Sequence, residues 1–119
     1  MQVAVVTFSV QPPYVRGVLV YICGIQASQQ IPIRGGDRSW QYMGSGASLD
    51  GKQSHMASAV EELEGHFAGG GVLDISKNTT LLIDDDARNI RAALRDGTRV
   101  IWFNPKKPQL LLPDIMKLV

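Results

Sequence analysis

The sequence has one cysteine, two histidines and no hydrophobic run of membrane-spanning length. Cys23 therefore has no disulfide partner within the chain, and its place in an apolar run predicts a small buried residue and favours a reducing compartment. His55 and His66 lack cysteine or histidine partners at metal-ligand spacing, which gives no support to a structural zinc site, and we expect His55 to be solvated. These absences predict a cytoplasmic protein without a membrane-spanning segment.

The sequence also lacks an excess of positive or negative charge. The 12 Lys and Arg residues nearly balance the 11 Asp and Glu residues, so the formal net charge is +1. Such a chain has no strong field to attract nucleic acid or anionic lipid, and we expect neither as a partner. With 45% hydrophobic and 19% charged residues, the 119-residue chain is expected to form a single domain over residues 1–119. The N-terminal residues also lack the basic region of a signal peptide.

Short apolar runs predict several strands. Val3–Phe8 is β-branched and nearly continuous, as in a strand that is covered on both faces. Thr79–Ile83 is the strongest candidate and stops at three acids, and Thr98–Phe103 predicts another strand. Ile31–Ile33 is a candidate short edge strand because its central residue, Pro32, cannot donate a ladder hydrogen bond.

Apolar residues at helical spacing predict helices between these strands. The expected helices are Pro12 to about Gly24, about Gln53 to His66, Ala87 to Arg95 with an end near Gly97, and a short helix near Leu110–Met116. Alternating strands and helices imply βαβ units, so the predicted fold class is a three-layer α/β/α sandwich with a mainly parallel sheet. A polar, glycine-rich insert of about residues 34–51 interrupts the pattern, and its Ser39–Tyr42 stretch permits a small hairpin.

The polar residues at strand exits are the candidate site, because ligands of open α/β sheets bind beyond the carboxyl ends of the strands. Thr7 and Ser9 follow the first predicted strand, and Lys52 precedes a helix. A hydroxyl can donate to a phosphate oxygen and a lysine can neutralise the same phosphate, so these residues are candidates for phosphate binding.

The three consecutive acids after Thr79–Ile83 allow two interpretations. Clustered carboxylates repel one another unless a cation offsets the charge, and oxygen-rich sites suit Mg²⁺. An acid can instead cap the following helix. For Asp84 and Asp85 both interpretations stay open, and for Asp86 the cap is favoured. If Asp84 serves function alone, Asp84→Ala is expected to leave fold stability unchanged, whereas a large loss would support capping.

Three segments resemble motifs of the haloacid dehalogenase-like (HAD) phosphohydrolases. Val3–Thr7 is similar to the second motif, an apolar strand that ends in a phosphate-binding Thr or Ser, and Gly51–Gln53 is similar to the lysine-containing third motif. Leu81–Asn89 resembles the fourth motif, an apolar strand followed by acids and an Asn. The resemblance spans roughly Val3 to Asn104 and implies a Rossmann-like sheet.

The resemblance also implies roles for individual residues. Lys52 would be the catalytic lysine that stabilises an aspartyl-phosphate intermediate, Asp84 or Asp85 would hold Mg²⁺, and Asn89 would support the loop. The substrate would be a phosphorylated small molecule.

The family's first motif is absent: no Asp-x-Asp that follows a strand precedes Thr7. The resemblance then supplies no nucleophile and no general acid, so the chain by itself is not expected to be a competent phosphatase. The missing strand is central in the family's sheet, and we expect an upstream segment, another chain or a second copy to complete it. The alternative is a non-enzymatic binding or regulatory module on the same scaffold.

Overall fold

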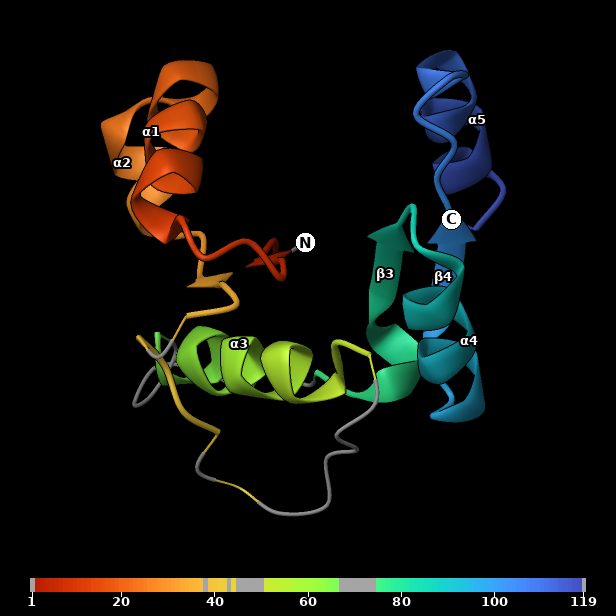
Figure 1. The fold of residues 1–119 in the computed structure, drawn as a ribbon, viewed down its shortest axis with the longest axis horizontal. Helices are drawn as coiled ribbons and strands as arrows, with labels where there is room; N and C mark the ends of the chain where they lie inside the picture. Colours follow the sequence, from red (N-terminus) through yellow and green to blue (C-terminus); the bar gives the residue numbers. More distant parts are fainter. Residues whose placement is uncertain (1, 38, 43, 45–50, 67–74, 119) are drawn as a thin grey trace. The chain divides into compact units, whose positions relative to one another are not determined.

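The computed structural model describes residues 2–37, 39–42, 44, 51–66 and 75–118. The chain divides into two compact units: the first comprises Met1–Ala47 and Lys52–Leu73, and the second Ser48–Gly51 and Asp74–Val119 (Figure 1). The expectation of a single domain over residues 1–119 stays a prediction. In the described ranges, every helix is too short or too polar to cross a membrane.

In the first unit, two helices connect two strands, and a further helix covers the strands. Its elements are β1 (Val5–Val6), α1 (Pro12–Cys23), α2 (Ile25–Gln29), β2 (Ile33–Arg34) and α3 (Gln53–Gly65). β1 and β2 are parallel, with Val5 opposite Ile33 and Val6 opposite Arg34. The Pro32 carbonyl accepts a hydrogen bond from the N–H of Val5 at 2.8 Å. The parallel pairing predicted from the alternation of elements is confirmed.

Polar and apolar contacts together hold α3 on β2. Ile33 on the strand and Ala59 and Leu63 on the helix are buried. The guanidinium of Arg34 donates from Nε to Ser58 Oγ at 2.8 Å and lies 3.0 Å from Glu62 Oε1. The amphipathic helix predicted from about Gln53 to His66 is thus present and ends one residue earlier.

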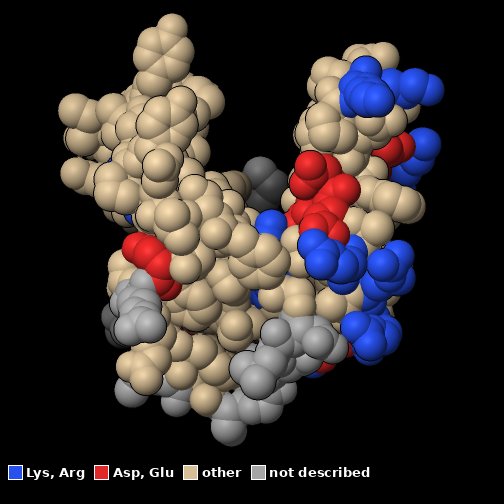
Figure 2. All heavy atoms as spheres, viewed as in Figure 1, with Lys and Arg blue, Asp and Glu red and all other residues tan. Residues whose placement is uncertain are grey.

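Local signals set the limits of α1, but its environment differs from the prediction. Prolines occupy its first turn, and Gly24 with φ +85° follows its last residue. None of its residues is buried, and Cys23, expected inside, is exposed. The main contacts of α1 in the described residues are with α2 and β2, and apolar side chains such as Tyr21 and Ile22 are exposed. Arg16, its one charged residue, donates to backbone carbonyls, and the surface of α1 and α2 is largely uncharged (Figure 2).

The second unit is a β-α-β unit followed by a short C-terminal helix. Its strands are β3 (Leu81–Asp84) and β4 (Arg99–Trp102), and its helices are α4 (Ala87–Arg95) and α5 (Leu111–Met116), with 3-10 turns at Lys77–Thr79 and Pro108–Leu110. The strands are parallel, with Asp84 opposite Trp102. Thr79, expected in the strand, instead forms a capping box with Ser76, so the strand begins two residues later.

The core of the second unit lies between α4 and the strands. Leu82, Ile101, Ile90 and Ala93 are buried. The Asp86 carboxylate accepts a hydrogen bond from the N–H of Arg88 at 2.8 Å and so caps α4 at its N-terminus. Gly97, with φ +87°, follows the end of α4. The predicted limits of this helix and the capping role of Asp86 are confirmed.

The strands form two separate two-stranded sheets, β1 with β2 and β3 with β4. The α/β class with short parallel strands is confirmed in this form. In the polar insert of about 34–51, Arg34 belongs to β2 and the Ser39–Tyr42 stretch contains no strand, so those four residues do not form the permitted hairpin. Residues 38, 43 and 45–50 of the insert lie outside the described residues.

The burial of side chains in the second unit predicts which substitutions in α4 lower the free energy of unfolding. Ile90→Ala removes a side chain that is 5% exposed and should lower the free energy of unfolding by about 2–4 kcal/mol. Leu94→Ala in the same helix removes a side chain that is 56% exposed and should change it by less than about 1 kcal/mol. Urea denaturation of both variants measures the difference, and equal losses would contradict the packing of α4.

Candidate functional site

The loop that follows β1 is built from two successive hydroxyl-backbone hydrogen bonds. Thr7 Oγ1 accepts from the N–H of Ser9 at 3.1 Å, and Ser9 Oγ accepts from the N–H of Gln11 at 3.2 Å. A hydroxyl that accepts still has its own hydrogen to donate. Both hydroxyls of this loop are therefore chemically suited to donate to an oxyanion.

Two glycines that the sequence analysis did not single out hold this loop in place. The N–H of Gly36 donates to the Ser9 carbonyl at 2.7 Å. A Cβ atom at Gly36 would lie 2.1 Å from the Phe8 carbonyl oxygen, and one at Gly35 would lie 2.8 Å from the Ser9 carbonyl oxygen. Only glycine permits so close an approach of two backbones. The Gly-Gly pair one residue after the predicted strand Ile31–Ile33 was the available signal.

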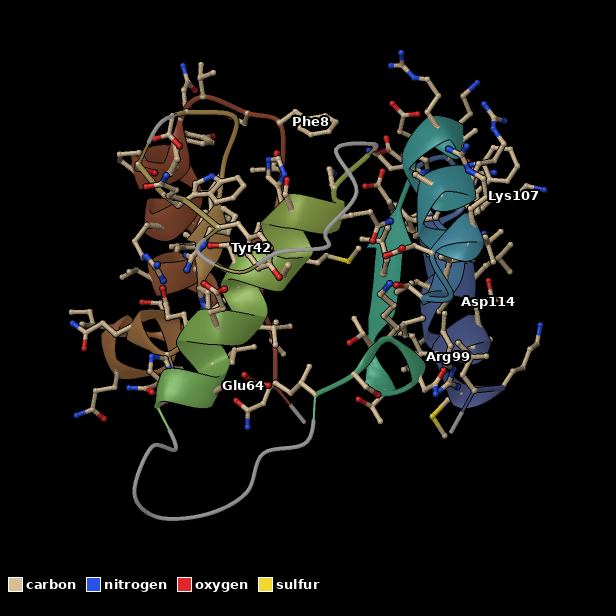
Figure 3. The ribbon with its side chains drawn as sticks, turned by 90° about the horizontal axis from the view of Figure 1, so that it is seen from below. Phe8, Tyr42, Glu64, Arg99, Lys107 and Asp114 are labelled. Carbon is tan, nitrogen blue, oxygen red and sulfur yellow. The ribbon has the colours of Figure 1, made fainter. Side chains whose placement is uncertain are left out.

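The N-terminus of α3 lies beside the same loop. Phe8, between the two hydroxyl residues, has its ring centroid 5.4 Å from Lys52 Nζ and 5.2 Å from the His55 ring. Figure 3 shows Phe8 near the N-terminal end of α3 and Glu64 at the opposite end. The structure thus places Phe8, which lies between Thr7 and Ser9 in sequence, beside Lys52 at one end of α3.

The first turn of α3 is electropositive. Lys52 is the residue before the helix, no side chain caps the turn, and the turn contains no acidic residue. The first N–H groups of a helix have no partner within the helix, and the helix dipole adds partial positive charge there. With the Lys52 ammonium, this end of α3 has the charge and donors that an oxyanion requires.

His55 is buried, so the expectation that it is solvated was wrong. Its ring lies 5.2 Å from that of Phe8 and 4.6 Å from that of Trp40, and the Trp40 indole donates to the Gly35 carbonyl at 2.8 Å. Burial lowers the pKa of His55, the positive charge of Lys52 lowers it further, and the Gly35 carbonyl opposes the shift. The rings of Phe8 and Trp40 cover His55. Because both residues come from segments distant in the sequence, the helical pattern around His55 does not reveal its burial.

In the second unit, Asp84 is a buried carboxylate with two donors. Its Oδ1 accepts from the N–H of Asp86 at 2.8 Å, and its Oδ2 accepts from Asn89 Nδ2 at 3.2 Å. Asn89 is also buried. These hydrogen bonds tie the end of β3 to the first turns of α4, so the Asp84 carboxylate has a structural role whatever else it binds.

Asp85 is exposed, and its backbone carbonyl accepts from Trp102 Nε1 at 3.1 Å. Trp102 is 64% exposed. The described part of the chain contains no group of three or more His, Cys, Asp or Glu side chains that could hold a metal. Mg²⁺ prefers six oxygen ligands and keeps several waters, so two carboxylates would leave most positions to water or phosphate. Magnesium binding by Asp84 and Asp85 stays a prediction.

Comparison with known proteins adds no relative. No protein-family model matches the chain, and neither the curated proteins nor the solved structures contain a match.

The hydrogen bonds of Asp84 change the expectation for its replacement. Asp84→Ala leaves the Asn89 amide and the Asp86 N–H without their acceptor and should lower the free energy of unfolding by about 1–3 kcal/mol. Asp85→Ala removes an exposed side chain and should change it by no more than about 0.5 kcal/mol. Thermal denaturation at pH 7.5 compares the two, and an unchanged melting temperature in Asp84→Ala would restore the purely functional interpretation.

The lowered pKa of His55 predicts loss of stability in acid. The unfolded chain takes up the histidine proton at about pH 6.5, whereas folded His55 resists protonation until a lower pH. As the pH falls from about 6.5 through the lower pKa of folded His55, proton binding therefore increasingly favours the unfolded state. The melting temperature should fall between pH 7.5 and 5.0, and His55→Phe should fall less. An equal fall in both proteins would assign it to other groups.

Proposed function

We propose that the first unit binds the phosphate group of a small molecule at the N-terminus of α3, within a HAD-like, phosphohydrolase-related domain. The observation that carries the proposal is the position of Phe8, which contacts both Lys52 and His55 while Thr7 and Ser9 flank it in sequence. The contact of Phe8 supports a site in which Thr7 and Lys52, which resemble the HAD phosphate-binding residues, act together.

Each group has a distinct role in this proposal. The hydroxyls of Thr7 and Ser9 donate to phosphate oxygens, and the Lys52 ammonium neutralises their charge. The first amides of α3 add donors, and the absence of an acid from its first turn avoids repulsion of the anion. No carboxylate nucleophile belongs to this set, so it supports binding of a phosphate ester and not its cleavage.

The strand pairing supports a three-layer HAD-like sandwich whose central strand comes from elsewhere. β1 pairs only with β2 and β3 only with β4 within the described ranges. Since backbone groups alternate between the two edges of a strand, the N–H and C=O groups of Val6 and Ile83 point away from these partners. We propose that an upstream segment, another chain or a second copy adds a strand at these edges.

Catalysis in this proposal depends on that added strand. A strand that ends in Asp-x-Asp would bring the nucleophile and the general acid, and a bound Mg²⁺ would offset negative charge near Asp84 and Asp85. Without it we expect weak Mg²⁺ binding and no phosphatase activity. The second candidate is a regulatory binding module, which the missing Asp-x-Asp favours because phosphate binding needs no nucleophile.

Calorimetric titration with inorganic phosphate tests the binding site. We expect Lys52→Ala and Thr7→Val each to weaken binding at least tenfold, about 1.4 kcal/mol, because each removes a donor to the anion. Lys106→Ala is the control, since Lys106 is an exposed lysine of the second unit. Wild-type binding that both site variants retain, or that Lys106→Ala abolishes, would contradict the proposed location.

A further inference from the structure

The first turn of α3 contains buried polar atoms that no hydrogen bond of the structure satisfies. These atoms are Gln53 Nε2 and the ring nitrogens of His55, for which the Gly35 carbonyl is the one acceptor that acts on the imidazole among the described residues. The Gln53 residue is 4% exposed and His55 is 9% exposed. An unsatisfied buried polar group costs about 1–3 kcal/mol, so a polar partner is expected at this place.

The position of these atoms indicates what kind of partner is missing. Gln53 is the first residue of α3 and His55 the third, so both belong to the turn whose amides lack a side-chain cap. Lys52 directly precedes them. A partner that satisfies an amide N–H, helix amides and an ammonium at once must be rich in acceptors and negatively charged.

The charged surroundings of His55 point the same way. On its own helix the nearby charge is Lys52, and the loop around Phe8 has no ionisable side chain. The segment after β2 packs against His55 through Gly35 and Trp40. The acidic residue described in this segment is Asp37, whose Oδ1 accepts a hydrogen bond from Ser39 Oγ at 2.8 Å. No carboxylate forms an ion pair with His55 in the described residues. A bound anion would supply the negative charge that protonated His55 lacks among the described residues.

We propose that Gln53 and His55 are two further ligands of the phosphate site, and that the site takes up a proton on His55 when it binds a dianion. This inference rests on the proposed function. Gln53 donates through Nε2, and His55 donates as the imidazolium. The one bond that forms is the second N–H bond of the imidazolium, and its proton comes from an O–H bond of solvent that breaks.

Sulfate is the probe that separates protonation of the protein from that of the ligand, because sulfate stays a dianion from pH 5.5 to 7.5 whereas phosphate titrates. Calorimetry should show wild-type affinity for sulfate about tenfold higher at pH 5.5 than at pH 7.5, as expected for partial uptake of one proton. His55→Phe fits the aromatic surroundings and should remove this dependence. His66→Phe, near the other end of α3, is the matched control and should retain it.

Proton NMR observes the same proton directly. The chain has two histidines, so two imidazole signals titrate, and the His66→Phe variant assigns them. Saturating sulfate should raise the pKa of His55 relative to the free protein. Equal pKa values of His55 with and without bound sulfate would overturn the proton uptake.

Stability distinguishes a ligand role from a structural one. Gln53→Met removes an unsatisfied amide, so its melting temperature should equal or exceed that of the wild type while its sulfate affinity falls at least fivefold. Gln109→Met, at an exposed glutamine of the second unit, is the control and should leave sulfate affinity unchanged.

The remaining outcomes decide between this inference and the proposed function. If Gln53→Met and His55→Phe bind sulfate as the wild type does at both pH values while Lys52→Ala does not, the inference is overturned and the proposed function stands. A large loss of melting temperature in Gln53→Met with unchanged affinity assigns Gln53 to the fold and overturns its role as a ligand. Failure of the wild type to bind either sulfate or phosphate overturns both proposals.

Discussion

The close packing of two backbone segments determines the candidate site of the first unit. Gly35 and Gly36 approach the Phe8–Ser9 backbone within distances that exclude a Cβ atom. This contact directs Phe8 toward the N-terminal end of α3, where it meets Lys52 and His55. The loop that carries the Thr7 and Ser9 hydroxyls is therefore positioned by main-chain contacts, which tolerate little displacement.

In the second unit, neighbouring carboxylates repel one another, and hydrogen bonds and solvent offset this repulsion. Asp84 is stabilised by an N–H group and the Asn89 amide, Asp86 by the N–H of Arg88, and Asp85 is solvated. Hydrogen bonds to the ionised form and solvation reduce the need for a cation. A row of acids after a strand is thus compatible with a purely structural role, and only ligand binding distinguishes the two.

Burial of individual side chains was harder to predict than the elements that carry them. Cys23 lies in an apolar run yet is exposed, and His55 lies in a polar helix start yet is buried. Both errors have one cause: periodicity predicts which face of a helix is apolar, but not how much chain is available to cover it. The contact of the loop after β1 with the start of α3 was foreseeable, because strand exits and helix N-termini gather at the same edge in parallel α/β units.

Local chemistry by itself determined the helix limits and the parallel pairs: Gly24 and Gly97 follow α1 and α4, Asp86 caps α4, and the alternation of elements required crossovers. The helix limits depend on neighbours within a few residues, and the parallel pairs follow from the order of strands and helices along the chain. Only the tertiary structure decided that His55 is enclosed by Phe8 and Trp40, and that Asp84 bonds to Asn89. Such contacts arise when elements pack together, and their energies depend on burial and geometry that no short sequence pattern encodes.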